Sequence, residues 1–290
     1  MTWPDDLRVC GMRASIAASF LTALICTHGF AQGQQDKQAG RGTIVRLAPV
    51  RQMREDVDLW PLILHPKSSA ERRINAALTR LNEDLKNKVN DCLSGEFAWS
   101  KDSFSSGEWQ RATKVTMRGP RLLSMVAADG FYCGGAHPDD DLTVVVFDLD
   151  TGEQLDWHAQ VSNSAGSSLP KTAVGDENGT PPLTLPELQV IYATAQEDHC
   201  KDYFEDERSF VLWPDAESGT LVAEVAGLPH VALPCKNELK LTIEKARKLG
   251  FDESLLEAIQ EAHRAAATGS TTRPVRKRPA PTAASHADSR

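Results

Sequence analysis

The residues best suited to chemistry are a histidine and three aspartates in the run 132–141, which reads Tyr-Cys-Gly-Gly-Ala-His-Pro-Asp-Asp-Asp. An imidazole beside a carboxylate can hold a metal ion or transfer protons. His137 and Asp139 are therefore the candidate catalytic residues, with Asp140 and Asp141 as alternative partners. No His-x-x-x-His pair, glutamate pair or nucleophile elbow accompanies them, so we expect a protein without catalytic activity, metal or cofactor.

The same run also has a structural interpretation. Gly134 and Gly135 permit positive φ and a close crossing of two segments, which Cys133 would staple together. His137 precedes a proline, which favours extended backbone, and we expect its ring to hydrogen-bond a loop carbonyl. A third hypothesis places Tyr132, the two glycines and His137 on a protein-binding surface.

An acidic cluster follows a predicted helix, and it is either a solvated face or a contact for a cationic partner. The net charge of the 290-residue chain is -8, and several basic residues lie in the last stretch, so the rest is more acidic still. Such a surface disfavours nucleic acid and anionic lipid. Glu205 and Asp206 are the candidate binding residues in the cluster. The cluster comprises Glu197, Asp198, Asp202, Glu205, Asp206 and Glu207.

Residues 1–31 are typical of a secretory signal peptide. Arg13 provides a positive flank, residues 14–27 are apolar, and small residues precede the predicted mature start at Gln32. Met12 is an alternative to the first residue as the start, and an uncleaved membrane-anchored N-terminus is the alternative to cleavage. We expect a periplasmic or secreted protein with no stable membrane span after cleavage.

Four cysteines remain in the predicted mature chain of about 260 residues, and an even number in an oxidising compartment predicts two disulfides. Of the three possible connectivities, we favour the local pairs Cys92 with Cys133 and Cys200 with Cys235. A zinc site is the alternative, but no Cys-x-x-Cys pair supports it.

The first element that would position these residues is a long helix. Ser68 and Glu71 form a possible capping box, and the helix is predicted to end near Leu93. Its apolar stripe has helical spacing, so one face should lie on a sheet. The stripe consists of Ile74, Ala77, Leu78, Leu81, Leu85, Val89 and Cys92.

Short β-prone runs divided by Gly, Pro and Asp clusters predict strands in hairpin-like groups, which argues against a doubly wound parallel sheet. A second helix is predicted from Thr184, with Glu187 and Pro186 in its first turn, to about Cys200, and a last helix begins at Asp252. The predicted strands cover residues 57–64, 114–117, 122–127, 142–149, 209–213, 220–225 and 239–243.

The fold class predicted from these elements is α+β, with an antiparallel sheet packed by two or three helices and stapled by disulfides. A single domain is expected at 57–268, with an exposed Ser/Gly/Pro-rich loop at 161–182. Residues 32–56 are predicted to be a flexible lead-in, and residues 269–290 a disordered basic tail.

The Gly-Gly-Ala-His run, with its preceding aromatic residue and the later Phe147-Asp148-Leu149-x-Thr151-Gly152 strand and turn, resembles RsiV-like anti-sigma factors. The similarity is to their extracytoplasmic α+β domain, and the member that names the family senses lysozyme by binding it. Most members have no assigned function. An internal transmembrane helix and a sigma-binding segment are not recognisable here, so signalling by proteolysis is not expected to carry over.

The resemblance implies an exported, non-catalytic domain that binds an envelope or extracellular protein or a cell-wall component. A basic, lysozyme-like hydrolase is the candidate partner. The alternative is a hydrolase acting on cell-wall glycan or peptide, either metal-assisted or dependent on His137 and the nearby aspartates.

Overall fold

The computed structural model describes residues 44–94, 107–134, 137–161, 179–180, 182–204, 206, 208–228 and 230–269. The predicted signal peptide, most of the predicted loop and the basic tail lie outside these residues, as do the candidate binding residues Gly135 and Glu205. The predictions for those segments stay predictions. No helix among the described residues has the length and apolar character needed to cross a membrane.

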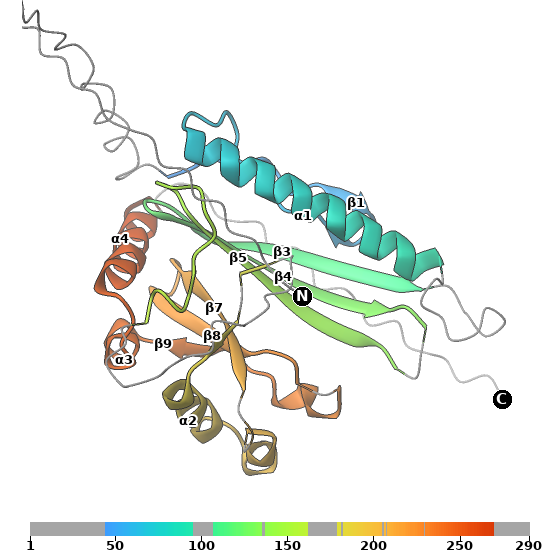
Figure 1. Cartoon of the computed structure of the whole chain (residues 1–290), viewed down its shortest axis with the longest axis vertical. Coiled ribbons are helices and arrows are strands. Elements are labelled where there is room, and N and C mark those ends of the chain that lie inside the picture. Colours follow the sequence, from blue (N-terminus) through green and yellow to red (C-terminus); the bar gives the residue numbers. More distant parts are fainter. Residues whose placement is uncertain are drawn as a thin grey trace, which may run out of the picture. The chain divides into compact units, whose positions relative to one another are not determined.

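Five strands form the first sheet in the order β1-β2-β3-β4-β5 (Figure 1). All neighbours are antiparallel except β2 and β3, which are parallel. The long β3-β4-β5 meander contains the three strands predicted between residues 114 and 149, and each extends further than its apolar run. The strands are β1 (Gln52–Arg54), β2 (Val57–Asp58), β3 (Glu108–Arg118), β4 (Leu122–Tyr132) and β5 (Asp139–Asp148).

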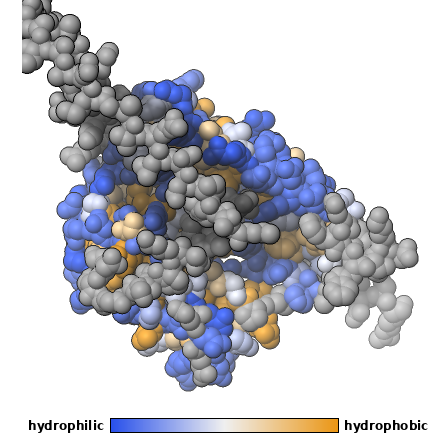
Figure 2. All heavy atoms as spheres, in the orientation of Figure 1, coloured by the Kyte–Doolittle hydropathy of each residue, from blue (hydrophilic) through white to orange (hydrophobic). Residues whose placement is uncertain are grey.

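Helix α1 (Ser69–Ser94) covers one face of this sheet, as its apolar stripe predicts (Figure 1). Ser68 Oγ accepts the N–H of Glu71 at 3.0 Å, which confirms the predicted cap. Buried α1 residues such as Ile74 and Leu78 pack on Leu123 of β4. The outward surface of α1 is hydrophilic in Figure 2.

The second sheet packs against the opposite face of the first, and its four strands are antiparallel in the order β6-β7-β8-β9. Three further α-helices and two 3-10 helices surround it. The strands are β6 (Leu183–Thr184), β7 (Ser209–Asp215), β8 (Thr220–Val225) and β9 (Leu239–Leu241). The helices are α2 (Pro186–Thr194), η3 (Asp198–Phe204), η4 (His230–Cys235), α3 (Ile243–Lys248) and α4 (Glu253–Gly269).

The predicted α+β class, with antiparallel strands and two disulfides, is confirmed. The strands form two sheets rather than the one expected. Met117, Leu122 and Val144 of the first sheet share a core with Phe210 and Leu212 of β7. Hairpin patterns specify neighbouring strands but not the number of sheets into which they assemble.

Two predicted elements are shorter than expected because side chains take over backbone partners. In the predicted strand at 57–64, the N–H groups of Trp60 and Ile63 donate to the side-chain oxygens of Asn82 and Asn75 on α1, each at 2.8 Å. This stretch is therefore tied to the helix, and the strand β2 ends at Asp58.

The predicted second helix begins and ends differently. Thr184 belongs to β6, where its hydroxyl lies 2.9 Å from that of Ser209, so it does not cap α2. Pro186 is the first residue of α2, as predicted, but the helix ends at Thr194 and Cys200 lies in the separate helix η3.

Order also begins earlier than predicted. Within the expected lead-in, Val45 is buried and its N–H bonds to the carbonyl of Arg118 at 3.0 Å, while β1 covers Gln52–Arg54. The apolar residues of this segment do not repeat with a helical or strand period over a useful length, and its backbone hydrogen bonds to distant residues fix it in place.

Candidate functional site

The loop that joins β4 to β5 contains the histidine singled out by the sequence. His137 is exposed, and its Nδ1 lies 3.0 Å from the carbonyl oxygen of Pro138. Gly134 has a φ of +90°, a conformation that favours glycine. Tyr132 ends β4 and is partly buried.

The strand that follows this loop lies at an edge of the first sheet. The backbone groups of even-numbered β5 residues turn away from β4: the carbonyl of Val144 accepts the N–H of Thr180 at 2.8 Å, and Val146 N–H donates to the Thr180 hydroxyl at 3.0 Å. Such outward groups on an edge strand invite pairing with another chain.

Two aspartates of the candidate catalytic site accept hydrogen bonds from outward-facing backbone N–H groups of this edge strand. Asp139 Oδ1 accepts the N–H of Asp140 at 2.9 Å, and Asp141 Oδ1 accepts the N–H of Leu142 at 2.8 Å. Both aspartates thus occupy outward donors that a foreign strand would need. Their role as partners of His137 stays a prediction.

The Asp140 side chain lies on the face of the sheet opposite to that of Asp139 and Asp141, because side chains alternate along a strand. Lys236 Nζ lies 3.0 Å from Asp140 Oδ2 and 3.3 Å from Glu224 Oε1, which joins β5 to β8. Burial raises the pKa of Glu224, although Lys236 acts against it. Burial lowers the pKa of Lys236, but its hydrogen bonds and ion pairs with both carboxylates outweigh burial and raise it. This group fastens the two sheets together.

The acidic cluster lies around η3, and its described carboxylates are exposed. Asp198 pairs with Lys201 at 2.6 Å and Glu197 lies 3.5 Å from His199, while Asp202 and Asp206 are exposed to solvent. Hydrogen bonding to Lys201 lowers the pKa of Asp198. The described part of the cluster is therefore a charged, solvent-exposed surface.

Both predicted disulfides are present, Cys92–Cys133 and Cys200–Cys235. His199 lies close enough to the second pair for a three-ligand metal group. The two sulfurs are bonded to each other, however, so the thiolates that zinc requires are not available. The structure thus supports the predicted disulfides over the zinc alternative.

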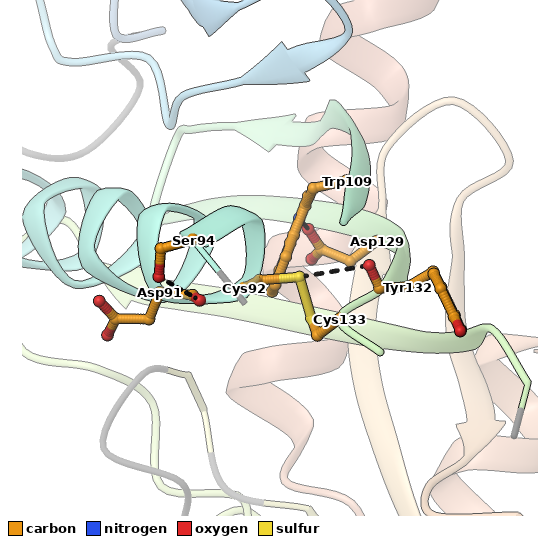
Figure 3. Close-up of a disulfide and its surroundings, with 7 residues drawn as sticks. All are labelled: Asp91, Cys92, Ser94, Trp109, Asp129, Tyr132 and Cys133. Atoms are coloured by element: carbon orange, nitrogen blue, oxygen red, sulfur yellow. Dashed lines mark hydrogen bonds between the residues drawn. A yellow bond between two sulfur atoms is a disulfide. The ribbon is translucent and has the colours of Figure 1, made fainter. Parts of the chain in front are cut away.

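The first disulfide joins the end of α1 to the end of β4 (Figure 3). Both of its cysteines line a hollow between the C-terminal half of α1 and the sheet. We call this space, of 410 Å³, the α1 hollow. Alternate residues of β3, β4 and β5 face it, because side chains along a strand alternate between the two faces. It is lined by Trp60, Leu81, Leu85, Lys88, Cys92, Trp109, Arg111, Asp129, Phe131, Cys133, Asp141 and Thr143.

A buried ion pair lies in the wall of the α1 hollow. Arg111 Nη1 donates to Asp129 Oδ2, and the two side chains are 4% and 2% exposed. Trp109 Nε1–H donates to Asp129 Oδ1 at 2.8 Å, and the two side chains lie together in Figure 3. Both carboxylate oxygens are therefore engaged. Burial raises the pKa of Asp129 and outweighs the opposing effects of Arg111 and Trp109.

Aromatic rings form much of the remaining wall. Trp109 stacks on Phe131, with 4.7 Å between ring centroids and 15° between planes. Arg111 Cζ lies 4.8 Å from the ring centroid of Trp60, a cation–π contact. At the rim, the exposed side chains Lys88 and Asp141 have opposite charges. The hollow is therefore apolar inside, and its formal charges offset one another.

The lining of the hollow consists of apolar and aromatic surface, one buried ion pair and two exposed charged residues. None of the described residues that line the hollow is a histidine, serine or free thiol. The Asp129 carboxylate is fully hydrogen-bonded and poorly placed to exchange protons with a substrate. Trp109, Arg111 and Phe131 were not among the residues predicted from the sequence, because the strands predicted at 114–117 and 122–127 stop short of them. The available signal was the every-second-residue spacing of Trp109 and Arg111 in β3 and of Asp129 and Phe131 in β4.

No protein-family model matches the chain, and no curated protein matches its sequence. Two solved structures described as DUF3298 family proteins resemble its fold. One, from Pseudomonas aeruginosa PAO1, is 15% identical and has a TM-score of 0.36. The match covers 53% of this chain and 66% of the Pseudomonas chain, so this chain spans just under two thirds of that protein's length. The other, from Bacteroides fragilis NCTC 9343, is 13% identical, with a TM-score of 0.40 over 70% and 87%. Likeness at this level does not assign a family, so the RsiV-like resemblance stays a prediction.

Proposed function

We propose that this chain is an exported, non-catalytic binding domain that holds an apolar group of its partner in the α1 hollow. The partner is an envelope or extracellular protein, with a basic lysozyme-like hydrolase as the first candidate, or a cell-wall component. The observation that carries the proposal is the hollow itself: 410 Å³ lies within the usual range of ligand pockets, and its aromatic walls surround a neutralised ion pair.

Export is supported by the cysteines. All four cysteines of the described residues are paired in disulfides, which persist in oxidising compartments and are rare in the cytosol. The exposed acidic cluster around η3 would steer a basic partner toward the domain at low salt, but it supplies charge without shape. The acidic cluster would thus raise the association rate of a basic partner, and contacts in the α1 hollow would slow its dissociation.

The test is capture by the mature protein, from Gln32 and with oxidised disulfides, of a defined panel that contains lysozyme and soluble peptidoglycan fragments. Leu85→Trp fills the hollow from the buried face of α1, and Asn87→Trp, an exposed position on the same helix, is the matched control. We expect at least one panel member to bind wild type and Asn87→Trp but not Leu85→Trp. Equal capture by all three proteins, or no capture at low salt, would overturn the proposal.

The hydrolase alternative rests on His137 and stays a prediction. It is tested on the same preparation by comparing peptidoglycan hydrolysis by wild type and His137→Ala, where loss of a measurable rate would support it.

A further inference from the structure

The lining of the α1 hollow constrains the charge of its ligand. Inside, Arg111 and Asp129 form an ion pair, and the two other charged residues of the lining, the exposed Lys88 and Asp141, carry one charge of each sign. A net charge entering this space would lose its hydration without gaining an opposite charge to replace it, which is costly. The ligand group is therefore neutral.

The walls also constrain its shape. Trp109 and Phe131 are stacked nearly parallel, and Trp60 is a third aromatic residue of the lining. Aromatic rings pack on one another with favourable geometry beyond simple burial of area. A flat ring thus makes better use of this hollow than a branched aliphatic group.

One donor in the wall is unmatched. A guanidinium has five N–H donors, and Asp129 accepts one from Nη1 of Arg111. Nε–H of the same side chain has no acceptor among the described residues, although the side chain is only 4% exposed. A buried donor without a partner is unfavourable. Nε is covered by neighbouring atoms, so a ligand oxygen is stabilised by it only if the guanidinium turns toward the hollow when the ligand enters.

We propose that the α1 hollow binds a neutral aromatic ring that bears a hydrogen-bond acceptor oxygen, which the Arg111 guanidinium contacts. The inference rests on the proposed function and specifies the chemistry of the group that enters. Both a tyrosine side chain of a protein partner and a free phenolic compound have this chemistry, and the test includes one probe of each kind.

The test compares small probes by ¹H–¹⁵N NMR, following the indole N–H signals of Trp60 and Trp109 in the full mature chain. 4-Methylanisole and 4-ethyltoluene have nearly the same size and differ by an oxygen in place of a methylene. We expect the anisole to bind about fivefold more tightly, the usual value of one hydrogen bond. 4-Methylbenzoate, which is charged, should bind more weakly than both.

Two further arms identify the contact and the source. In Arg111→Met/Asp129→Leu/Trp109→Phe the ion pair and the indole N–H that Asp129 accepts are all replaced by apolar groups, and the preference for the anisole over the ethyltoluene, followed on the Trp60 signal, should disappear. N-acetyltyrosine amide should shift both indole signals at lower concentration than 4-methylphenol if the natural occupant is a protein side chain, and the reverse order assigns a free phenol. Either order supports the aromatic acceptor.

The inference is overturned if the ethyltoluene binds as tightly as the anisole, if the benzoate binds most tightly, or if no probe shifts the indole signals. Its failure is separable from failure of the proposed function. Capture of a panel member that is lost in Leu85→Trp, together with no response to any aromatic probe, would leave the proposed function standing and refute the ligand chemistry alone.

Discussion

Replacement of Arg111 by methionine tests whether the wall of the α1 hollow is as dry as the structure indicates. The partner carboxylate of Asp129 is 2% exposed, so water cannot replace the lost cation. Removing one member of a buried ion pair typically costs about 3–5 kcal/mol. Because a protein of this kind has a total stability of roughly 5–15 kcal/mol, the loss would be a large fraction of it.

The pH dependence of this penalty provides a second test. Burial raises the pKa of Asp129, and Arg111 opposes that rise, so Arg111→Met should raise the pKa further. A carboxyl group whose pKa is higher in the folded than in the unfolded state stabilises the fold at pH values below the unfolded-state pKa, which is about 3.9 for aspartate. This stabilisation is lost as the pH rises through the folded-state pKa. The variant should therefore regain stability relative to wild type as the pH falls from 7 toward 4.

The assay is urea unfolding at several pH values with both disulfides oxidised. Arg111→Met/Asp129→Leu removes both charges and should recover most of the stability lost in Arg111→Met at pH 7, the remainder reflecting the Trp109 N–H that loses its acceptor. Glu83→Gln, which breaks the exposed pair with Lys86, should change stability by less than about 1 kcal/mol. A loss below about 1 kcal/mol for Arg111→Met, or a penalty that does not shrink in acid, would mean that water reaches Asp129 and would refute the reasoning.

Three further predictions concern the rest of the fold. Cys92→Ser/Cys133→Ser, which opens a 41-residue loop, should cost about 4 kcal/mol in urea unfolding and abolish ligand binding in the α1 hollow, whereas Cys200→Ser/Cys235→Ser should cost a similar amount and leave binding intact. Gly152→Ala should lower the melting temperature more than Gly227→Ala: both have positive φ, but a Cβ at 152 would lie 2.5 Å from the carbonyl oxygen of Ala70, and nothing lies within 4 Å at 227. Because burial raises the pKa of Glu224, wild type should gain stability relative to Glu224→Gln as the pH falls from 7 through the folded pKa toward 4.3, and a gain on raising the pH would contradict the assignment.

Local signals in the sequence were enough to predict α1 and the disulfides. The stripe from Ile74 to Cys92 repeats at helical spacing, and Ser68 marks its start, so the helix could be placed within a residue or two. The cysteine pairs join neighbouring elements, which made the local connectivity the simplest.

The candidate site could not be predicted because it depends on polar residues inside strands. Asp129 and the aspartates 139–141 are typical of loops, so the predicted strands ended before them. Their places in β4 and β5 depend on distant partners: Arg111 across the sheet for Asp129, and Lys236 from the second half of the chain for Asp140. Hydrophobic periodicity contains no information about such pairs.

The most direct test of the proposed function is to record the indole N–H signals of Trp60 and Trp109 while each panel member is added to ¹⁵N-labelled mature protein. We predict that a bound partner shifts both signals, because both rings line the α1 hollow, and that Leu85→Trp prevents the shift. A partner that binds stoichiometrically while both signals stay in place, with changes confined to residues near the acidic cluster of η3, would contradict the central claim.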